Sequence, residues 1–311
     1  MNLVFIFIGF LLLVIGGEFI VRSSVALSFK FNISKFIIGM TVVSFATSLP
    51  ELIVSINAAI NDFPSVAINN VIGSNIANIG LVLALVSILS KISVANKFYK
   101  RDWPWMFFLS IVLSFFIYTD STLDRLEGII LISILIFFIF KILNKPDSHE
   151  IYNDVNDKLL FVSNFKIIIW LILSSLTLYF GAEFLVDGAV NFAKQINISE
   201  AVISVTIIAI GTSIPELAAS LVAIARNEKG ISVGNLIGSN IFNIGSVLGI
   251  TAVIKEIPIA EEIIQRDIIW MLLFATILIV LAIFPKKNSL SKYKGFIMLL
   301  CYFTFIFQAF T

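Results

Sequence analysis

The sequence predicts an all-α membrane protein, with ten transmembrane helices arranged as two inverted repeats of five helices each. Three observations predict this fold class: a very apolar composition, apolar segments of membrane-spanning length, and a pair of sequence blocks that occurs once in each half of the chain. Of the 311 residues, 59% are hydrophobic and 13% are charged, and the mean hydropathy is +1.04. A soluble chain of this length needs a more charged surface.

The chain contains ten apolar segments, each close to the length of about 20 residues that an α-helix needs to cross a bilayer. A polar segment at 144–165 separates five of them from the other five, so we expect a first half at 1–143, a cytoplasmic linker and a second half at 166–311. Hydrophobic pattern and length place the segments at roughly 3–25, 35–60, 66–90, 104–119, 126–143, 166–186, 199–225, 231–253, 268–285 and 295–310.

The basic residues predict the orientation of these segments. With the N-terminus outside the cell, only four of the 21 lysines and arginines would lie outside: Arg125, Lys194, Lys255 and Arg266. The other 17 fall on the inner side, and an excess of Lys and Arg marks the cytoplasmic side of a membrane protein. We therefore expect a multi-pass protein of the cell (inner) membrane with both termini outside.

The second half of the sequence repeats the first. Adding 165 to a residue number aligns the halves without a gap between residues 18 and 78. Because each half has an odd number of segments, the second copy must be upside down relative to the first. Inverted repeats are typical of transporters, whose substrate sites lie near the bilayer midplane. The matched positions include Glu18 and Glu183, Thr47 and Thr212, Glu51 and Glu216, Gly73-Ser74-Asn75-Ile76 and Gly238-Ser239-Asn240-Ile241, and Asn78 and Asn243.

Each copy places a proline and a glutamate inside an apolar segment, in Thr47-Ser48-Leu49-Pro50-Glu51 and in Thr212-Ser213-Ile214-Pro215-Glu216. A charged side chain within a membrane span costs about 3 kcal/mol or more. A proline removes one helical hydrogen bond, here the bond to the carbonyl of Ala46 or Gly211. Two such costs in one turn, present twice, predict a functional site.

Polar side chains surround these glutamates at helical spacing, and all of them offer oxygen atoms. Oxygen atoms are the ligands that hard cations such as Ca²⁺, Mg²⁺ and Na⁺ prefer, and freed carbonyls at a helix break are a further way to hold Na⁺. The stripes are Ser44, Thr47, Ser48 and Glu51, repeated as Ala209, Thr212, Ser213 and Glu216, and Asn70, Ser74 and Asn78, repeated as Asn235, Ser239 and Asn243.

Two structural explanations compete with a cation site. The glutamates could form buried ion pairs, but no Lys or Arg lies in the middle of an apolar segment. The Ser, Thr and Asn stripes could join helices by hydrogen bonds, which is common in membranes, but their repetition beside the glutamates favours a site. Elsewhere, Glu18 and Arg22 are spaced for a local ion pair, and Glu183 and Asp187 are expected at the membrane interface.

The sequence disfavours an enzyme. One cysteine, Cys301, and one histidine, His149, exclude a disulfide framework and a Cys/His zinc site. No apolar segment contains a histidine, and no Ser–Lys or paired-Asp arrangement typical of a membrane hydrolase stands out. We expect no enzymatic activity, no prosthetic group and no nucleic-acid partner.

The two pairs of blocks closely resemble the α-repeats of prokaryotic-type Na⁺/Ca²⁺ exchangers. Ser-Phe-Ala-Thr-Ser-Leu-Pro-Glu at 44–51 with Gly-Ser-Asn-Ile-Ala-Asn at 73–78 resembles the first α-repeat, within 35–90. Ala-Ile-Gly-Thr-Ser-Ile-Pro-Glu at 209–216 with Gly-Ser-Asn-Ile-Phe-Asn at 238–243 resembles the second, within 199–253. The resemblance implies the cation/Ca²⁺ antiporter fold, with central cation sites between the second, third, seventh and eighth helices.

The resemblance also implies a ligand set. It gives carboxylate ligands at Glu51 and Glu216, hydroxyl and carbonyl ligands at Thr47, Ser48, Thr212 and Ser213, backbone carbonyl ligands at Ser44 and Ala209, and further ligands at Ser74, Asn78, Ser239 and Asn243.

The chain departs from the family pattern at two places. Asn243 and Asn78 stand where some members carry Asp, so the site has only two formal negative charges. Ala46 stands where the second copy has Gly211, which we expect to stiffen the first helix break. The Gly-Ser-Asn blocks also resemble those of K⁺-dependent exchangers, in which an acidic residue stands at the position of Asn243.

The resemblance implies an antiporter that exchanges external Na⁺ for internal Ca²⁺ by alternating access. We expect Ca²⁺ and Na⁺ as its substrates, the lipid bilayer as its surroundings, and a monomer. An H⁺/Ca²⁺ antiporter on the same fold stays open, because protons could neutralise the two glutamates in place of Na⁺. A passive cation channel is a weaker alternative, because a channel does not need an inverted repeat.

Overall fold

The computed structural model describes residues 2–144, 159–196 and 211–310. Contacts between residues divide the chain into two compact units, each described here by itself. Unit 1 comprises residues 1–47 and 142–235, and unit 2 comprises residues 48–141 and 236–311. The predicted ligand Ala209, the start of segment 199–225 and most of the predicted linker 144–165 lie outside the described residues.

Helices make up most of the described chain, and five short π-helical segments (η) interrupt or begin them. The elements are α1 (Asn2–Phe31), α2 (Lys35–Ile38), η1 (Gly39–Val43), α3 (Ser44–Thr47), α4 (Leu49–Ile60), α5 (Ser65–Ala77), η2 (Asn78–Leu83), α6 (Ala84–Leu89), β1 (Ile92–Ser93), η3 (Phe98–Asp102), α7 (Trp103–Asp120), β2 (Thr122–Leu123), α8 (Arg125–Asn144), α9 (Asn164–Gln195), α12 (Ile214–Ala225), α13 (Lys229–Phe242), η6 (Asn243–Leu248), α14 (Gly249–Ile254), β3 (Ile257–Pro258), η7 (Ile263–Asp267), α15 (Ile268–Ile283), β4 (Ser289–Leu290) and α16 (Lys292–Phe310).

Several of these helices are long and apolar enough to cross a membrane. Within the described ranges, eight continuous helical stretches meet that description: 2–31, 35–60, 65–89, 98–120, 125–144, 164–195, 229–254 and 263–283. Helix α12 is apolar but shorter, at 12 residues. Helix α16 covers the last predicted segment, so each of the ten predicted segments overlaps a helix.

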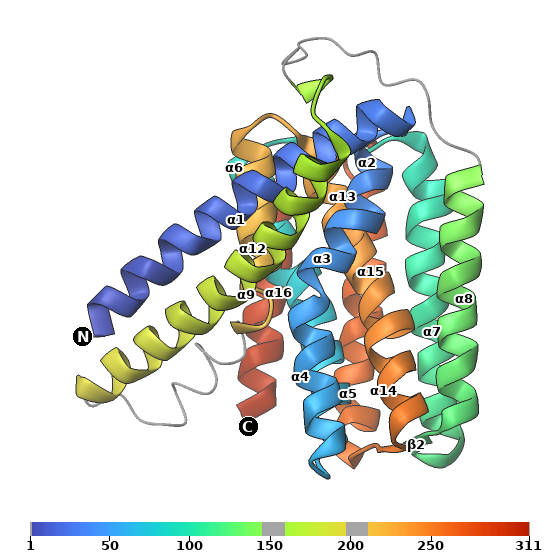
Figure 1. Ribbon diagram of the computed structural model, residues 1–311. Helices are drawn as coiled ribbons and strands as arrows, with labels where there is room; N and C mark the ends of the chain where they lie inside the picture. The colour runs from blue at the N-terminus through green and yellow to red at the C-terminus, as the bar shows by residue number, and fades with distance from the viewer. Residues whose placement is uncertain (1, 145–158, 197–210, 311) are drawn as a thin grey trace. The chain divides into compact units, whose positions relative to one another are not determined.

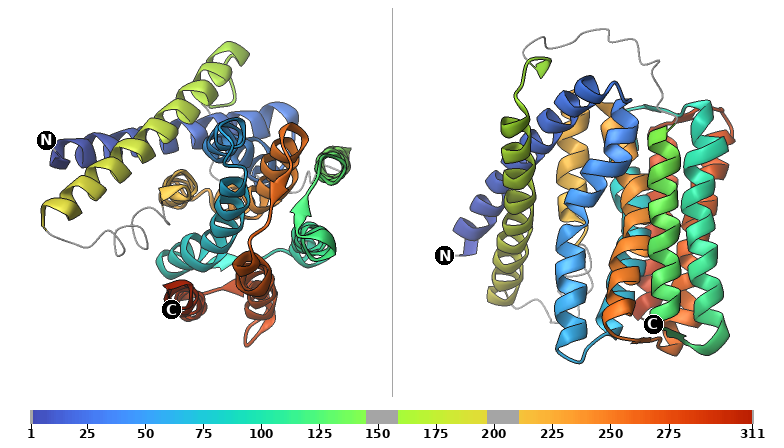
Figure 2. Two further views of the ribbon diagram at one scale, coloured as in Figure 1. Left: turned by 90° about the horizontal axis from the view of Figure 1, so that it is seen from below. Right: turned by 45° about the vertical axis from the view of Figure 1, so that its right-hand side comes forward.

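In unit 1, the long helices α1 and α9 lie against each other (Figures 1 and 2). Their backbones approach closely at two glycines: a Cβ atom on Gly9 would lie 2.7 Å from the carbonyl oxygen of Gly181, and one on Gly181 would lie 3.0 Å from that of Gly9. Small residues allow this kind of contact between membrane helices. Helix α12 also packs on α1.

Both long helices extend beyond the predicted segments 3–25 and 166–186. In α1, two of the serines after Arg22 bond back to the helix through their hydroxyls. Ser23 Oγ donates to the carbonyl of Ile20 at 3.0 Å, and Ser28 Oγ donates to that of Val25 at 3.0 Å. Serines that satisfy themselves in this way are compatible with a helix interior, so the predicted bounds are too short.

Unit 2 holds helices α4 to α7, α14 to α16 and most of α8. Helix α16 packs along α6, where a Cβ atom on Gly295 would lie 2.6 Å from the carbonyl oxygen of Ala84. Two short antiparallel ladders, which the sequence did not predict, join loops: β1 pairs with β4, with Ile92 opposite Leu290, and β2 pairs with β3, with Thr122 opposite Pro258.

The sequence repeat is visible in the backbone. Five pairs of elements begin and end at positions that the repeat makes equivalent: α4 and α12, η2 and η6, α6 and α14, β1 and β3, and η3 and η7. After α4 and α12 the chain turns through residues of positive φ, Asp62 at 69° and Asn227 at 61°. The two copies therefore fold alike as far as residues 102 and 267, beyond the residues 18–78 that the sequence comparison aligned.

Candidate cation site

Each proline–glutamate block stands at the start of a new helix. Helix α3 ends at Thr47 and α4 begins at Leu49, with Ser48 between them at φ −86° and ψ 1°. Helix α12 begins at Ile214, after Ser213 at φ −90° and ψ 4°. Proline suits the first turn of a helix, because its missing N–H has no intrahelical partner there. Ser48 and Ser213 therefore have nearly the same backbone angles, although Ala46 stands where the second copy has Gly211.

This placement explains how the two glutamates can be buried. Glu51 and Glu216 lie in the first turns of α4 and α12, and both are 0% exposed. The aligned peptide dipoles give a helix N-terminus a partial positive charge, which stabilises a carboxylate. The helix break therefore offsets part of the cost of placing a negative charge in an apolar segment.

The two predicted asparagine ligands also stand at a change in helix geometry. Asn78 is the first residue of η2 and Asn243 is the first residue of η6. A third π-helical segment, η1, ends just before Ser44. π-Helical turns frequently occur at functional sites. All three lie beside residues that the sequence predicts as ligands.

In unit 1, Asn235 connects three hydroxyl groups. Thr47 Oγ1 donates to Asn235 Oδ1 at 3.1 Å, and Asn235 Nδ2 donates to Ser220 Oγ at 3.4 Å. Ser44 Oγ lies 2.9 Å from the carbonyl oxygens of both Asn235 and Gly39, and can donate to either. Because all four polar side chains are buried, this network holds the first copy's hydroxyls against the second copy's asparagine helix.

The second copy contributes Ser213 and Glu216 to unit 1. Ser213 is 1% exposed, and its Oγ has no hydrogen-bond partner among the described residues. Thr212 is half-buried in the turn before α12. A buried hydroxyl oxygen beside a buried carboxylate is a ligand that a hard cation accepts.

Unit 2 contains the matching arrangement around Glu51. Asn70 Nδ2 lies 3.3 Å from Ser55 Oγ and 3.4 Å from the backbone carbonyl of Glu51. The Asn70–Ser55 contact is the first copy's equivalent of the Asn235–Ser220 contact in unit 1. Ser48, which corresponds to Ser213, is 4% exposed, and its Oγ likewise has no hydrogen-bond partner in the described part of the chain.

The other asparagines of unit 2 leave amide oxygens available. Asn243 Nδ2 donates to Asn75 Oδ1 at 3.1 Å, and Asn75 Nδ2 donates to the carbonyl of Asn240 at 3.3 Å. Asn243 Oδ1 and both polar atoms of Asn78 are buried without a hydrogen-bond partner within the described ranges. A buried polar atom without a partner costs about 1–3 kcal/mol, and a bound cation would satisfy such an oxygen. Ser74 and Ser239 are buried one turn earlier.

The structure thus distributes the predicted ligands between the units. Unit 1 contains Ser44, Thr47, Thr212, Ser213 and Glu216, and unit 2 contains Ser48, Glu51, Ser74, Asn78, Ser239 and Asn243. Across residues 2–144, 159–196 and 211–310, no three Asp, Glu, His or Cys side chains gather into a metal site. In each unit the predicted ligands offer one carboxylate together with hydroxyl, amide or carbonyl oxygens, which are the ligand types that Na⁺ and Ca²⁺ prefer.

Four polar residues near the site were not predicted as part of it: Ser55, Ser220, Asn75 and Asn240. A signal for the two serines was present in the sequence, because each stands one helical turn after a glutamate and the two occupy equivalent positions of the repeat. The asparagines belong to the repeated Gly-Ser-Asn blocks. Only the structure shows that Asn75 holds the nitrogen of Asn243.

The predicted ion pair between Glu18 and Arg22 is confirmed, with Arg22 Nε 2.6 Å from Glu18 Oε1. Arg226 joins it, because Nε and Nη2 donate to the two oxygens of Glu18 at 2.8 Å each. Glu18 therefore ties α1 to the end of α12. Glu183 and Asp187, which correspond to Glu18 and Arg22 in the second copy, are exposed on α9.

Comparison with known proteins covers nearly the whole chain. The model of a family described as sodium/calcium exchanger protein matches residues 1–143 and 166–311. The putative antiporter CaxA of Alkalimonas amylolytica is 32% identical, over 99% of this chain and 98% of its own. The sodium/calcium exchanger MaX1 of Methanosarcina acetivorans is 28% identical, over 98% of this chain and 97% of its own.

A similar fold has been solved. A structure of the sodium-calcium exchanger NCX_Mj, soaked with zero Na⁺ and Ca²⁺, superposes with a TM-score of 0.82 at 29% identity and covers 97% of both chains. The sodium/potassium/calcium exchanger 2 of Homo sapiens is 29% identical, but over only 40% of this chain and 19% of its own.

Proposed function

Because this chain belongs to the sodium/calcium exchanger family, we propose that it exchanges Na⁺ for Ca²⁺ and extrudes Ca²⁺ from the cytoplasm. The family and the fold indicate a multi-pass membrane antiporter that exchanges a cation for Ca²⁺. The observation that carries the proposal is the pair of fully buried glutamates, each in the first turn of a helix after a proline and each beside a repeated set of hydroxyl and amide oxygens.

The proposed ligands are those that the family pattern implies. Glu51 and Glu216 supply the charge, and the structure supports their role by burying both. Ser48, Ser213, Asn78 and Asn243 each have a buried oxygen without a hydrogen-bond partner among the described residues, which supports a role for them as well. The remaining proposed ligands are Ser44, Thr47, Ala209, Thr212, Ser74 and Ser239.

Charge accounts for the coupling between the two ions. Two ionised glutamates carry −2, which one Ca²⁺ neutralises. Na⁺ ions can bind the same oxygens, but Ca²⁺ and a full set of Na⁺ ions would together leave a large net positive charge in a site of low dielectric constant. Each ion therefore stabilises the site only when the other has left, and a site that opens alternately to the two sides exchanges them.

The proposed topology has ten transmembrane helices in two inverted repeats, with a cytoplasmic linker, both termini outside, and a monomer in the cell (inner) membrane. The matching bounds of equivalent elements in the two halves support the repeat. The distribution of the 21 lysines and arginines supports the orientation. The orientation makes residues 144–165 cytoplasmic.

Ca²⁺ flux in sealed vesicles tests the proposed coupling. Purified protein is reconstituted, Ca²⁺ is supplied outside, and a Na⁺ gradient directed outward or a pH gradient is imposed separately. We expect Ca²⁺ uptake with the Na⁺ gradient alone. Uptake with the pH gradient alone would show instead that protons are the counter-ion. Ca²⁺ uptake that needs neither gradient would indicate a channel.

A further inference from the structure

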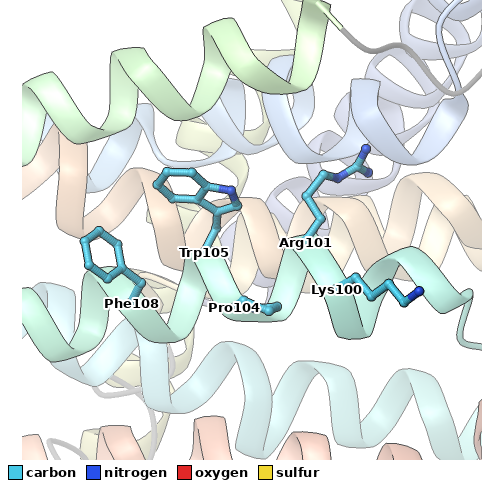
Figure 3. A pocket seen from close by; sticks show the side chains of 5 residues that line it. All are labelled: Lys100, Arg101, Pro104, Trp105 and Phe108. Carbon is cyan, nitrogen blue, oxygen red and sulfur yellow. The ribbon is translucent and has the colours of Figure 1, made fainter.

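A basic cavity lies in unit 2 at the start of the helix formed by η3 and α7. Its volume is about 230 Å³, and its lining residues are Lys100, Arg101, Pro104, Trp105 and Phe108 (Figure 3). None of them is a candidate cation ligand. The five residues form one stripe along the helix, with Lys100 and Arg101 at one end and Phe108 at the other (Figure 3). The cavity therefore changes from charged to apolar along its length.

Helix α8 places a third cation and two aromatic rings beside Trp105. Lys141 Nζ lies 5.2 Å from the centroid of the Trp105 ring, a distance at which a cation and an aromatic ring attract each other. The rings of Phe137 and Phe138 lie 5.9 Å and 5.7 Å from the same indole. Trp105, on α7, thus packs against α8, with a lysine over its ring.

The two lysines supply the excess positive charge. Arg101 Nε lies 2.6 Å from Asp102 Oδ1, and the Asp102 side chain is 2% exposed, so the charge of Arg101 is balanced within the protein. Lys100 and Lys141 are both exposed. They are accessible to an anion from the surroundings.

The second copy of the repeat provides an internal comparison. Arg266 and Asp267 form the same pair, also at 2.6 Å, and Trp270 corresponds to Trp105. Gln265, however, stands at the position of Lys100. Gln308 stands at that of Lys141, because β2 and β4, like the first residues of α8 and α16, are 167 positions apart. The arginine–aspartate pair and the tryptophan therefore belong to the shared fold, whereas the two lysines are specific to the first copy.

We propose that this cavity binds the headgroup of an anionic phospholipid. Lys100 and Lys141 hold the phosphate, and Trp105 and Phe108 contact the glycerol and the upper part of an acyl chain. Basic clusters at the ends of membrane helices attract anionic lipids, and tryptophan prefers the level of the headgroups. Phe108 is 47% exposed, so the apolar end of the cavity continues into the lipid-facing surface. Free phosphate would gain nothing from that apolar end.

Fluorescence quenching by brominated lipids tests the proposal. The probe is the variant W103F/W170F/W270F, which keeps Trp105 as its single tryptophan, reconstituted in vesicles of brominated phosphatidylglycerol or brominated phosphatidylcholine mixed with unlabelled lipid. We expect phosphatidylglycerol to be preferred beside Trp105 by roughly tenfold. In the same background, K100Q/K141Q should bring the preference close to one.

Three controls make the result specific. K292Q removes one exposed lysine from the start of α16 and should leave the preference unchanged. A variant that keeps only Trp270 should show no preference, because the second copy lacks both lysines. Inorganic phosphate at constant ionic strength should leave the lipid preference unchanged.

Several outcomes would overturn the proposal. One is equal quenching of Trp105 by the two brominated lipids. Another is a loss of the phosphatidylglycerol preference in K292Q as large as that in K100Q/K141Q. A third is displacement of phosphatidylglycerol by inorganic phosphate, which would identify a simple anion site. If the single-tryptophan variant does not fold, native mass spectrometry of the intact protein and of K100Q/K141Q decides the question. Equal retention of phosphatidylglycerol by both proteins would contradict the proposal.

Discussion

The first copy of the repeat, residues 18–102, and the second, residues 183–267, place a buried glutamate at the same point of the same helix break, yet they differ in the groups around it. Both copies have a serine directly before the new helix, Ser48 or Ser213. Both also have an asparagine–serine contact, at 3.3 Å in the first copy and 3.4 Å in the second. Ser44 stands where the second copy has Ala209, and Lys100 stands where it has Gln265. The buried glutamate and the asparagine–serine contact are therefore common to both copies, whereas Ser44 and Lys100 distinguish the first copy from the second.

The largest expected loss of Ca²⁺ exchange comes from replacing Glu51 or Glu216, which occupy equivalent positions of the repeat. Glu51→Gln and Glu216→Gln each keep the side-chain shape and remove half of the site's charge. A charge at about 4 Å contributes about 4 kcal/mol at an effective dielectric constant near 20, so either variant should lose Ca²⁺ exchange by about a hundredfold or more. Vesicle flux measures this loss. Near-normal exchange in one variant would show that the two copies are not equivalent.

The second prediction concerns Asn243, which differs from the acidic residue of K⁺-dependent exchangers. With only two glutamates, carrying K⁺ together with Ca²⁺ would leave an uncompensated positive charge, which is costly in a buried site. Na⁺-driven Ca²⁺ flux should therefore be unchanged when choline replaces K⁺. Asn243→Asp should make the flux sensitive to K⁺. Loss of flux without K⁺ in the parent protein would contradict the charge argument.

The third prediction separates the two asparagine–serine contacts. Asn235 is 0% exposed and bonds to Thr47 and Ser220, whereas Asn70 is only half-buried. Asn235→Ala should lower the free energy of unfolding by about 3 kcal/mol and Asn70→Ala by about 1 kcal/mol, because a buried hydroxyl that loses its partner is costly. Thermal unfolding in detergent measures the difference. Equal losses would mean that the two contacts are interchangeable.

The smallest expected effect lies at the turn after α4, where Asp62 corresponds to Asn227. The hydrogen bond from Lys255, and then its positive charge, lower the pKa of Asp62. A carboxyl with a lowered pKa in the folded state stabilises the protein above its ordinary pKa of about 4. That stability is lost as the pH falls through the lower value. Asp62 is 81% exposed, so Asp62→Asn should leave the melting temperature at pH 7 nearly unchanged. A large drop would show that this surface pair matters more than its exposure suggests.

The helix starts at the two proline–glutamate blocks could be predicted from the sequence, because they depend on residues that are close together in the chain. Proline lacks an N–H, so the breaks before Pro50 and Pro215 follow from covalent structure. The repeat predicted that the second copy would break as the first does, and Ser48 and Ser213 agree within a few degrees in φ and ψ.

Other features depend on contacts that a local pattern does not contain. The π-helical turns at Asn78 and Asn243 need a change of hydrogen-bond partner along the helix, for which these sequences give no signal. Arg226 reaches Glu18 across 208 positions of sequence, and the β1–β4 ladder joins loops from opposite halves of the chain. The length of α1 was underestimated because Ser28 and Lys30 interrupt the apolar pattern after residue 25, and the bond from Ser28 Oγ to the carbonyl of Val25 is seen only in the structure.

Equilibrium Ca²⁺ binding tests the central claim most directly, namely that Glu51 and Glu216 serve one Ca²⁺ together. Titration of the purified protein with radioactive Ca²⁺ in the absence of Na⁺ gives the number of ions bound per chain. We predict one Ca²⁺ for the parent protein, none in the same concentration range for either Glu51→Gln or Glu216→Gln, and displacement by Na⁺. Two ions per chain, each lost in only one of the two variants, would show that the glutamates form separate sites and would contradict the account.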